Sequence, residues 1–209
     1  MLSSLAQWVQ DVIEQLGYLG VALLVVLENV FPPIPSEIVL PFAGFVAQQG
    51  SYSVVLMILA ATVGSVIGAL IMYWIAAIIG DERLHAFTRK FGKWVQIREA
   101  DLTRAEEWFD RHAMSAVLVG RCVPLIRSVV SIPAGFRRMK LVPYIAYTFL
   151  GSLVWNIALV GAGAVLGENW ESVGSYVEVF QWVVIALVVA VAARFVLGVY
   201  RRRNQKLNS

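Results

Sequence analysis

The sequence predicts an all-α integral membrane protein, an inverted repeat with two re-entrant hairpins, about three transmembrane helices and amphipathic surface helices. Of its 209 residues, 59% are hydrophobic and 15% are charged, whereas soluble domains carry roughly 25% charged residues. Long uncharged runs occupy 51–80 and 141–167. Between shorter apolar arms the chain carries two proline-containing breaks. We therefore expect a single polytopic membrane domain over residues 1–209.

The first elements are a surface helix and a hairpin. Residues 1–16 are expected to form an amphipathic helix, because Trp8 and Val12 fall on one helical face. Residues 17–50 consist of two apolar arms around a polar, proline-rich centre. Each arm is shorter than the roughly 20 residues that a helix needs to cross the bilayer. This pattern favours a re-entrant hairpin, which enters the membrane and returns to the same side.

Three segments are long enough to cross the membrane. The runs 51–80 and 141–167 contain no charged residue, and 177–200 carries only Glu178 and Arg194 near its ends. Side chains near helix ends can extend to the lipid headgroups. We therefore predict three transmembrane helices.

The remaining segments are a charged connector, a second hairpin and a basic tail. Residues 81–112 show amphipathic spacing that suits helices on the inner leaflet, although a solvated connector with no further role is the simpler alternative. Residues 113–140 resemble the first hairpin, with short apolar arms around Pro124 and Pro133. Residues 201–209 are expected to be a tail that anchors at the membrane surface.

Charge asymmetry predicts the orientation. No lysine or arginine precedes Arg83. The positive-inside rule places the basic segments 81–112 and 201–209 in the cytoplasm, and the acidic loop 168–178 outside. The first hairpin then opens outwards and the second opens to the cytoplasm. A repeat supports two inverted halves, since Ala43-Gly44-Phe45 recurs as Ala134-Gly135-Phe136, a plan typical of secondary transporters.

Four charged residues lie where hydropathy places the membrane interior. A charge at the bilayer centre costs roughly 3 kcal/mol on insertion scales, so such residues are expected to meet each other, water or a charged ligand. Arginine can bind two phosphate oxygens at once, and a buried carboxyl group can carry a proton. The candidates are Arg121 and Arg127 for binding a phosphate, and Glu28 and Glu37 for coupling or gating. Alternatively, these acids and arginines simply pair and lock the hairpins together.

Prolines explain how a polar pocket forms between the arms. Pro33, Pro35, Pro124 and Pro133 break the hairpins and free backbone groups from intrahelical bonds. Such backbone is tolerated at membrane depth only where protein buries it or where it lines a wet cavity.

Several other residues receive ordinary structural interpretations. Asn29 and Asn156 are candidates to donate hydrogen bonds inside the bundle, and Cys122 is expected to be a packing residue. Trp155 is assigned with other tryptophans to an interfacial aromatic belt. His85 and the other histidine are expected to be surface residues.

Other classes of function find no support in the sequence. The net charge of +3 is small and dispersed, which argues against nucleic-acid binding. One cysteine excludes an internal disulfide and a cysteine-rich metal site. The chain lacks the motifs of Walker ATPases, zinc proteases and serine hydrolases. We expect no enzyme activity, no cofactor and no metal.

These motifs together resemble the DedA family, also called the SNARE-associated or VTT-domain family. The segment Glu28-Asn-Val-Phe-Pro-Pro-Ile-Pro-Ser-Glu37 is similar to its first signature, and Gly120-Arg121-Cys-Val-Pro-Leu-Ile-Arg127 to its second. Two departures are Cys122, where many members have phenylalanine, and Ala69, where many have aspartate. The resemblance covers roughly residues 15–170.

The resemblance implies lipid translocation. Bacterial relatives are implicated in returning undecaprenyl phosphate across the cytoplasmic membrane, others in phosphatidylethanolamine movement or proton-dependent drug tolerance, and eukaryotic relatives are described as scramblases. By position, Glu28, Glu37, Arg121 and Arg127 match the acidic and basic residues that are functionally important in the family.

The leading hypothesis is a flippase for undecaprenyl phosphate or a similar phosphate-headed lipid in the bacterial cytoplasmic membrane. A proton or sodium gradient would drive it, and the C-terminus would be cytoplasmic. The alternatives are a proton-coupled antiporter of small cations or drugs and a non-transporting envelope assembly factor, with an embedded lipid phosphatase the weakest. A homo-oligomer is left open.

Overall fold

The computed structural model describes residues 2–31, 36–83, 85, 99–124 and 126–169. The described residues belong to one compact unit. The predicted span 177–200 and tail 201–209 thus lie outside the described residues. All secondary structure that the described residues form is helical, which confirms the all-α fold class.

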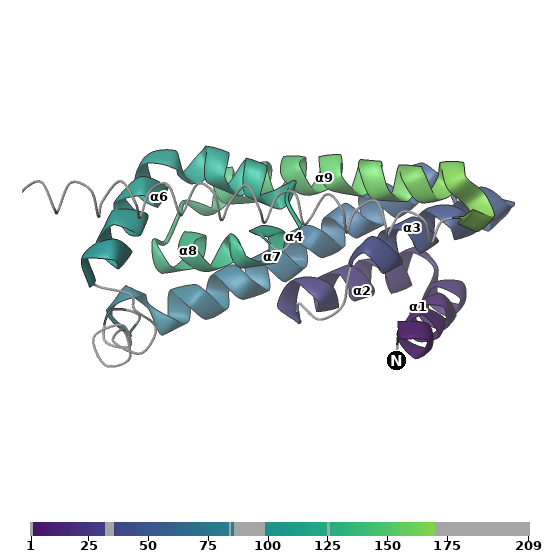
Figure 1. Ribbon diagram of the computed structural model, residues 1–209, viewed down its shortest axis with the longest axis horizontal. Coiled ribbons are helices and arrows are strands. Elements are labelled where there is room, and N and C mark those ends of the chain that lie inside the picture. Colours follow the sequence, from purple (N-terminus) through teal and green to yellow (C-terminus); the bar gives the residue numbers. More distant parts are fainter. Residues whose placement is uncertain (1, 32–35, 84, 86–98, 125, 170–209) are drawn as a thin grey trace, which may run out of the picture. The chain divides into compact units, whose positions relative to one another are not determined.

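Two long apolar helices run along the length of the unit (Figure 1). They are α4 (Val54–Ile79) and α9 (Leu141–Leu166), each of 26 residues. At 1.5 Å per residue each is about 39 Å long, enough to cross a hydrocarbon layer of about 30 Å. Both end at a glycine with positive φ, Gly80 at 77° and Gly167 at 54°, a backbone conformation that favours glycine at helix C-termini.

The first hairpin region consists of short helices preceded by a surface helix. The surface helix is α1 (Leu2–Leu16), and the arms are α2 (Tyr18–Val30) and α3 (Ser36–Val46), followed by the short π-helix η1 (Ala47–Ser51). α1 packs on α2 and α3 through Val9 and Ile13, which are buried, whereas Trp8 is exposed. Val9 and Ile13 therefore lie on the face that packs on the arms, whereas Trp8, which the sequence pattern placed on the apolar face, is not buried there.

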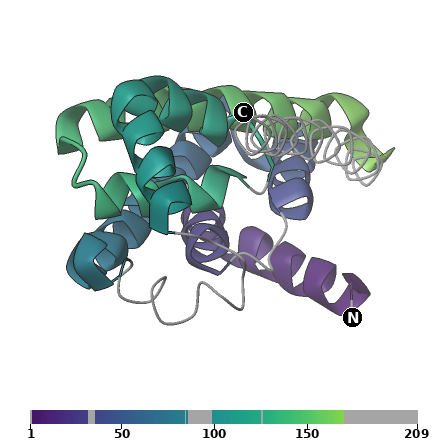
Figure 2. The ribbon, with the colours of Figure 1, turned by 60° about the vertical axis from the view of Figure 1, so that its left-hand side comes forward.

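The second hairpin region begins in a longer helix than the sequence suggested. α6 (Glu99–Arg121) runs from the charged segment into the apolar arm and is kinked at His112 (φ −124°, ψ 16°). After the break come α7 (Ile126–Val129) and α8 (Ser131–Phe136). A short 3₁₀ turn, η2 (Gly167–Asn169), follows α9. Figures 1 and 2 both show α1 on the opposite side of the unit from α6.

The two hairpin regions pack on the long helices in an exchanged pattern. The first arms contact the long helix of their own half, α2 on α4 and α6 on α9. The second arms contact the long helix of the other half, α3 on α9 and α8 on α4. The re-entrant course and the inverted symmetry themselves stay predictions.

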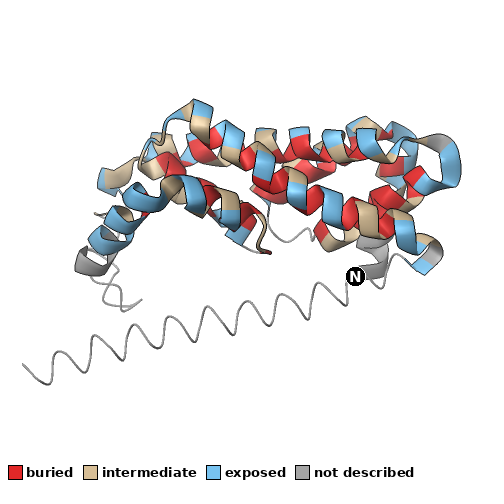
Figure 3. Cartoon of the chain, turned by 90° about the horizontal axis from the view of Figure 1, so that it is seen from above, coloured by how far each residue is buried: buried red, intermediate tan, exposed pale blue. Residues whose placement is uncertain are grey.

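Two glycines allow these exchanged contacts. A Cβ at Gly44 would overlap the carbonyl oxygen of Val160, and a Cβ at Gly135 would overlap that of Tyr73. Small residues at such positions let helix backbones approach closely in membranes. Buried residues accordingly gather on the inward helix faces, while the outward faces and the charged half of α6 are exposed (Figure 3).

Candidate functional site

The predicted site residues lie at the ends of the hairpin arms. Glu28 is in the last turn of α2 and Glu37 in the first turn of α3. Arg121 is the last residue of α6, and Arg127 lies in α7. The first arms α2 and α6 end here because a break that contains proline follows each of them in the sequence.

Two of the four predicted prolines lie in the described part of the chain. Pro33 and Pro35 lie outside the described residues. Pro124 is buried in the break between α6 and α7, and Pro133 lies half-buried within α8.

A buried ion pair joins the two hairpins. Arg127 donates from Nη2 to Oε1 of Glu28, and the residues are 6% and 3% exposed. The guanidinium carbon of Arg127 lies 5.9 Å from the centre of the Trp155 ring, which is within range of a cation–π interaction. Each charge thus has a partner of opposite sign in a region where an isolated charge would be costly.

Arg121 is held by neutral groups. It is 1% exposed and donates to Oδ1 of Asn29 at 2.9 Å, to Oγ of Ser131 at 2.6 Å and to the Tyr144 hydroxyl at 3.4 Å. Asn29 is oriented by its own bond from Nδ2 to the Val25 carbonyl, 2.8 Å long. In the part of the chain that the structure describes, no carboxylate pairs with Arg121.

Glu37 is placed differently from Glu28. It is half-buried, and none of the described residues forms a hydrogen bond or ion pair with its carboxylate. The structure therefore brings Glu28 and Arg127 together directly and leaves Glu37 outside the pair.

The paired and hydrogen-bonded groups keep some polar atoms free. Glu28 Oε2, Arg127 Nη1 and Arg121 Nε are buried and have no hydrogen-bond partner among the described residues. Native structures rarely leave such atoms unsatisfied without water, an ion or a functional reason. Chemically, the free guanidinium nitrogens can bind an anion, and the free carboxylate oxygen can accept a proton.

The sequence missed several residues of this site. Trp155 is buried beside Arg127, so its assignment to an interfacial belt is wrong. Ser131 and Tyr144 were not singled out. For Tyr144 the available signal was its place among other polar residues within the uncharged run 141–167, where a lipid-facing position would favour an apolar side chain.

A second polar cluster lies at the end of α4. Arg137 binds Asp110 through two bonds, of 3.0 and 2.5 Å, and Asp81 through one of 2.7 Å. Asp81, His85 and Glu106 place ligand atoms within 4.8 Å of one another, and Arg137 is the cation beside them. The hydrogen bonds to Asp110 raise the pKa of Arg137, and the same bonds lower the pKa of Asp110. This cluster ties α8 to α6 and to the end of α4.

Comparison with known proteins gives matches over most of the chain. Residues 34–165 match the VTT domain. An "Alkaline phosphatase-like protein" of Lactococcus lactis subsp. cremoris is 42% identical over 90% of this chain and 87% of its own length. "Undecaprenyl phosphate transporter A" of Staphylococcus aureus is 34% identical over 91% of this chain and 96% of its own length. The protein with that name in Bacillus subtilis is 30% identical over 93% and 92%. No solved structure matches the chain.

Proposed function

The chain belongs to the VTT domain family, also called the DedA family, and from that premise we propose that it transports undecaprenyl phosphate or a lipid with a similar phosphate head group. Two relatives that align over nearly their whole length carry the name undecaprenyl phosphate transporter. The observation that carries the proposal is the buried Glu28–Arg127 pair, which joins the hairpins. Nη1 of Arg127 and Oε2 of Glu28 have no hydrogen-bond partner among the described residues.

The pair suits an exchange of partners. In the empty site Glu28 neutralises Arg127. A phosphate that binds Arg127 Nη1 competes with Glu28 for the guanidinium, and Glu28 then takes up a proton or a sodium ion. The site carries no large net charge in either state, which matters because an uncompensated buried charge is costly. This exchange couples lipid movement to an ion gradient.

The other predicted residues have supporting roles in the same proposal. Arg121 is fixed by Asn29, Ser131 and Tyr144, so it supplies a second, positioned positive charge next to the phosphate rather than a mobile one. Glu37 has no partner among the described residues and gates the approach to the pair. The lipid tail stays in the bilayer, so only the head group needs a polar route.

The proposed setting is the bacterial cytoplasmic membrane. The helices α4 and α9 are long and apolar enough to cross it. We also propose a third span at 177–200 and a cytoplasmic C-terminus. The two hairpins then open to opposite sides of the membrane.

The test is head-group translocation of undecaprenyl phosphate by the purified protein in liposomes, with inorganic phosphate measured in the same samples. We expect rapid translocation by the native protein and none by Arg127→Ala. Arg111→Ala is the matched control, because Arg111 is exposed on α6 and its Nε binds the Glu107 carbonyl at 3.1 Å. It should translocate normally.

Other outcomes point to other functions. Release of inorganic phosphate without translocation would indicate a lipid phosphatase, in line with the name of the Lactococcus relatives. No movement of the lipid under an imposed proton or sodium gradient would overturn the proposal and leave a cation antiporter or an assembly factor.

A further inference from the structure

The interface between α4 and α9 carries polar residues over much of its length. The helices pack against each other, and polar residues recur on the facing sides at intervals of three or four, the spacing of one helical face. We call this set the seam; it comprises Thr62 and Ser65 of α4 and Tyr144, Thr148, Ser152, Trp155 and Asn156 of α9. All seven residues are buried.

Direct hydrogen bonds join the seam at its two ends. Asn156 donates from Nδ2 to Oγ1 of Thr62 at 3.1 Å. Tyr144 donates from its hydroxyl to the Ala69 carbonyl at 3.0 Å. Between Tyr144 and Asn156 the seam extends over about 18 Å of α9, at 1.5 Å per residue.

Several polar atoms of the seam have no partner. Ser65 Oγ, Thr148 Oγ1, Trp155 Nε1 and Asn156 Oδ1 are buried without a hydrogen bond to any described residue. Serine and threonine in membrane helices usually satisfy themselves by bonding the carbonyl four residues earlier. Thr62 does this with the Ile58 carbonyl at 2.7 Å, but Ser65 and Thr148 do not. Their hydroxyl groups are therefore available to bind a group other than the described residues.

The seam is continuous with the candidate site. Trp155 belongs to the seam and its ring lies beside Arg127, the partner of Glu28. At the other end, the Tyr144 hydroxyl also accepts a bond from Arg121 at 3.4 Å. Arg127 from α7 is ion-paired with Glu28, and Glu37 lies in the first turn of α3. The face of α4 towards α2 presents Gly64 and Gly68.

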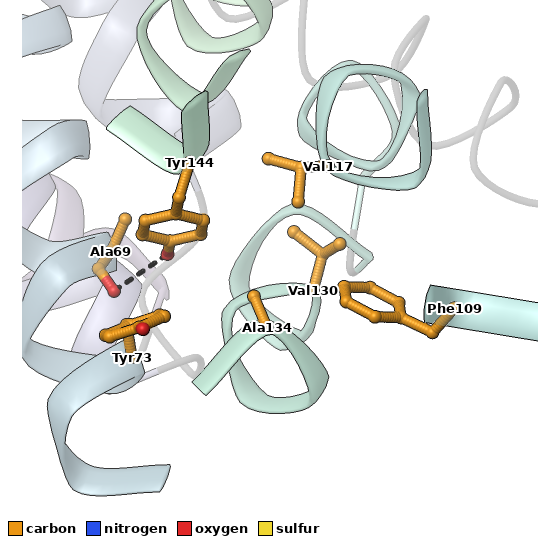
Figure 4. Packing of buried hydrophobic residues seen from close by; sticks show 7 residues of the cluster. All are labelled: Ala69, Tyr73, Phe109, Val117, Val130, Ala134 and Tyr144. Atoms are coloured by element: carbon orange, nitrogen blue, oxygen red, sulfur yellow. Dashed lines mark hydrogen bonds between the residues drawn. The ribbon is translucent and has the colours of Figure 1, made fainter. Parts of the chain in front are cut away.

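An aromatic and apolar cluster closes the seam at the Tyr144 end. The rings of Tyr73 and Tyr144 lie 4.9 Å apart, and Val117, Val130 and Ala134 pack around them (Figure 4). The Tyr73 hydroxyl is bound to the Met139 carbonyl at 2.7 Å. Water in the seam would thus be internal, separated from the surface by this cluster.

We propose that the seam holds a row of internal water molecules, which the hydroxyl, indole and amide groups bind, and that this row delivers the proton that Glu28 accepts. Buried polar groups without protein partners are the usual binding sites of internal water. In the relay, a water O–H bond breaks as the Glu28 O–H bond forms. Each water then takes a proton from the next, and the last proton enters from the aqueous side when the Tyr73–Tyr144 closure opens. The relay rests on the proposed transport function, whereas the hydration does not.

The first test is radiolytic hydroxyl-radical footprinting of the intact protein in vesicles, which labels side chains next to bound water. We expect labelling of Trp155 and Tyr144 although both are buried. Met57 is the internal control, because it is fully buried on the same α4 but lies about 140° around the helix from Thr62. Labelling of the two aromatic residues no stronger than that of Met57 would overturn the proposal.

The second test is Thr148→Val, which removes one unpartnered hydroxyl at nearly constant volume. If water satisfies Thr148, the apparent melting temperature should not rise, and the labelling of Trp155 should fall. If the seam is dry, the variant should melt at a higher temperature, because an unsatisfied buried group has been removed. That rise would contradict the proposal.

A transport assay distinguishes a failure of the relay proposal from a failure of the proposed function. With a translocating native protein, Thr148→Val combined with Ser65→Ala should lose stimulation by a pH gradient while it still binds the lipid. Unchanged stimulation would overturn the relay. A labelled seam in a native protein that moves no undecaprenyl phosphate would instead overturn the proposed function and keep the hydration.

Discussion

The two hairpin regions share a plan but carry opposite charges. In the first, Glu28 and Glu37 flank the break; in the second, Arg121 and Arg127 do. The first is formed by two short separate helices, whereas the second continues an amphipathic helix, α6, and has its other arm divided into α7 and α8. Because each sign is confined to one hairpin, Glu28 and Arg127 neutralise each other only where the two hairpins meet. The ion pair therefore depends on how the halves are placed.

The largest expected effect comes from removing one partner of that pair. Arg127→Ala leaves Glu28 buried and unpaired, which should cost about 3–5 kcal/mol of stability. The double variant Glu28→Leu/Arg127→Met should recover most of this loss, since apolar replacements of buried ion pairs are often neutral. Resistance to unfolding in detergent measures both. Translocation should stay absent in the double variant.

Two other results for the double variant would change the interpretation of the ion pair. If the double variant were as unstable as the single one, the contact between the halves would need more than charge neutrality. If it transported lipid, the pair would be structural only.

An intermediate effect is expected where the second arms meet the opposite long helices. Gly44→Ala and Gly135→Ala each place a Cβ on a backbone carbonyl, and overpacking of this kind costs about 1–3 kcal/mol. The matched control is Gly161→Ala on α9, where a Cβ would have no neighbour within 4 Å. Melting temperatures should fall for the first two and not for the third. Unequal losses would show which half depends more on the exchanged contact.

The smallest effect concerns the cluster that anchors only the second hairpin region. Arg137 lowers the pKa of Asp110, so their ion pair contributes stability above the ordinary aspartate pKa of about 4, and this is lost as the pH falls through the lower folded value. Asp110→Asn should cost less than about 1 kcal/mol at pH 7, because the pair is partly exposed.

The measurement is the dependence of the melting temperature on pH in the acidic range. The melting temperature of the native protein should fall at acidic pH more steeply than that of Asp110→Asn. Glu107→Gln, which changes an exposed neighbouring carboxylate, should retain the native slope. Parallel curves for the native protein and Asp110→Asn would mean that this cluster does not anchor α8.

The sequence predicted what depends on local hydropathy. The runs 51–80 and 141–167 contain α4 and α9, because an uncharged run of that length has few stable alternatives. The cost of burying charge identified Glu28 and Arg127, which the structure joins. Composition did not reveal that α6 continues across His112, because hydropathy reports the surroundings of a residue and not the continuity of its backbone.

The partners of each charge could not be predicted. Arg121 meets Asn29, Ser131 and Tyr144, which come from three different helices. Neutral side chains carry no charge that would identify them in the sequence as partners of an arginine. Only the packing of the helices selects them. The same holds for Trp155 beside Arg127.

The exchanged packing of α3 and α9 has a consequence for how the protein is made. Gly44 fits against Val160, a residue that is synthesised more than 100 residues after Gly44. Until α9 is made, this close contact of α3 cannot form. Synthesis of α9 is thus the event that allows the first half to finish folding, so truncation before α9 should leave both halves unfinished rather than one half intact.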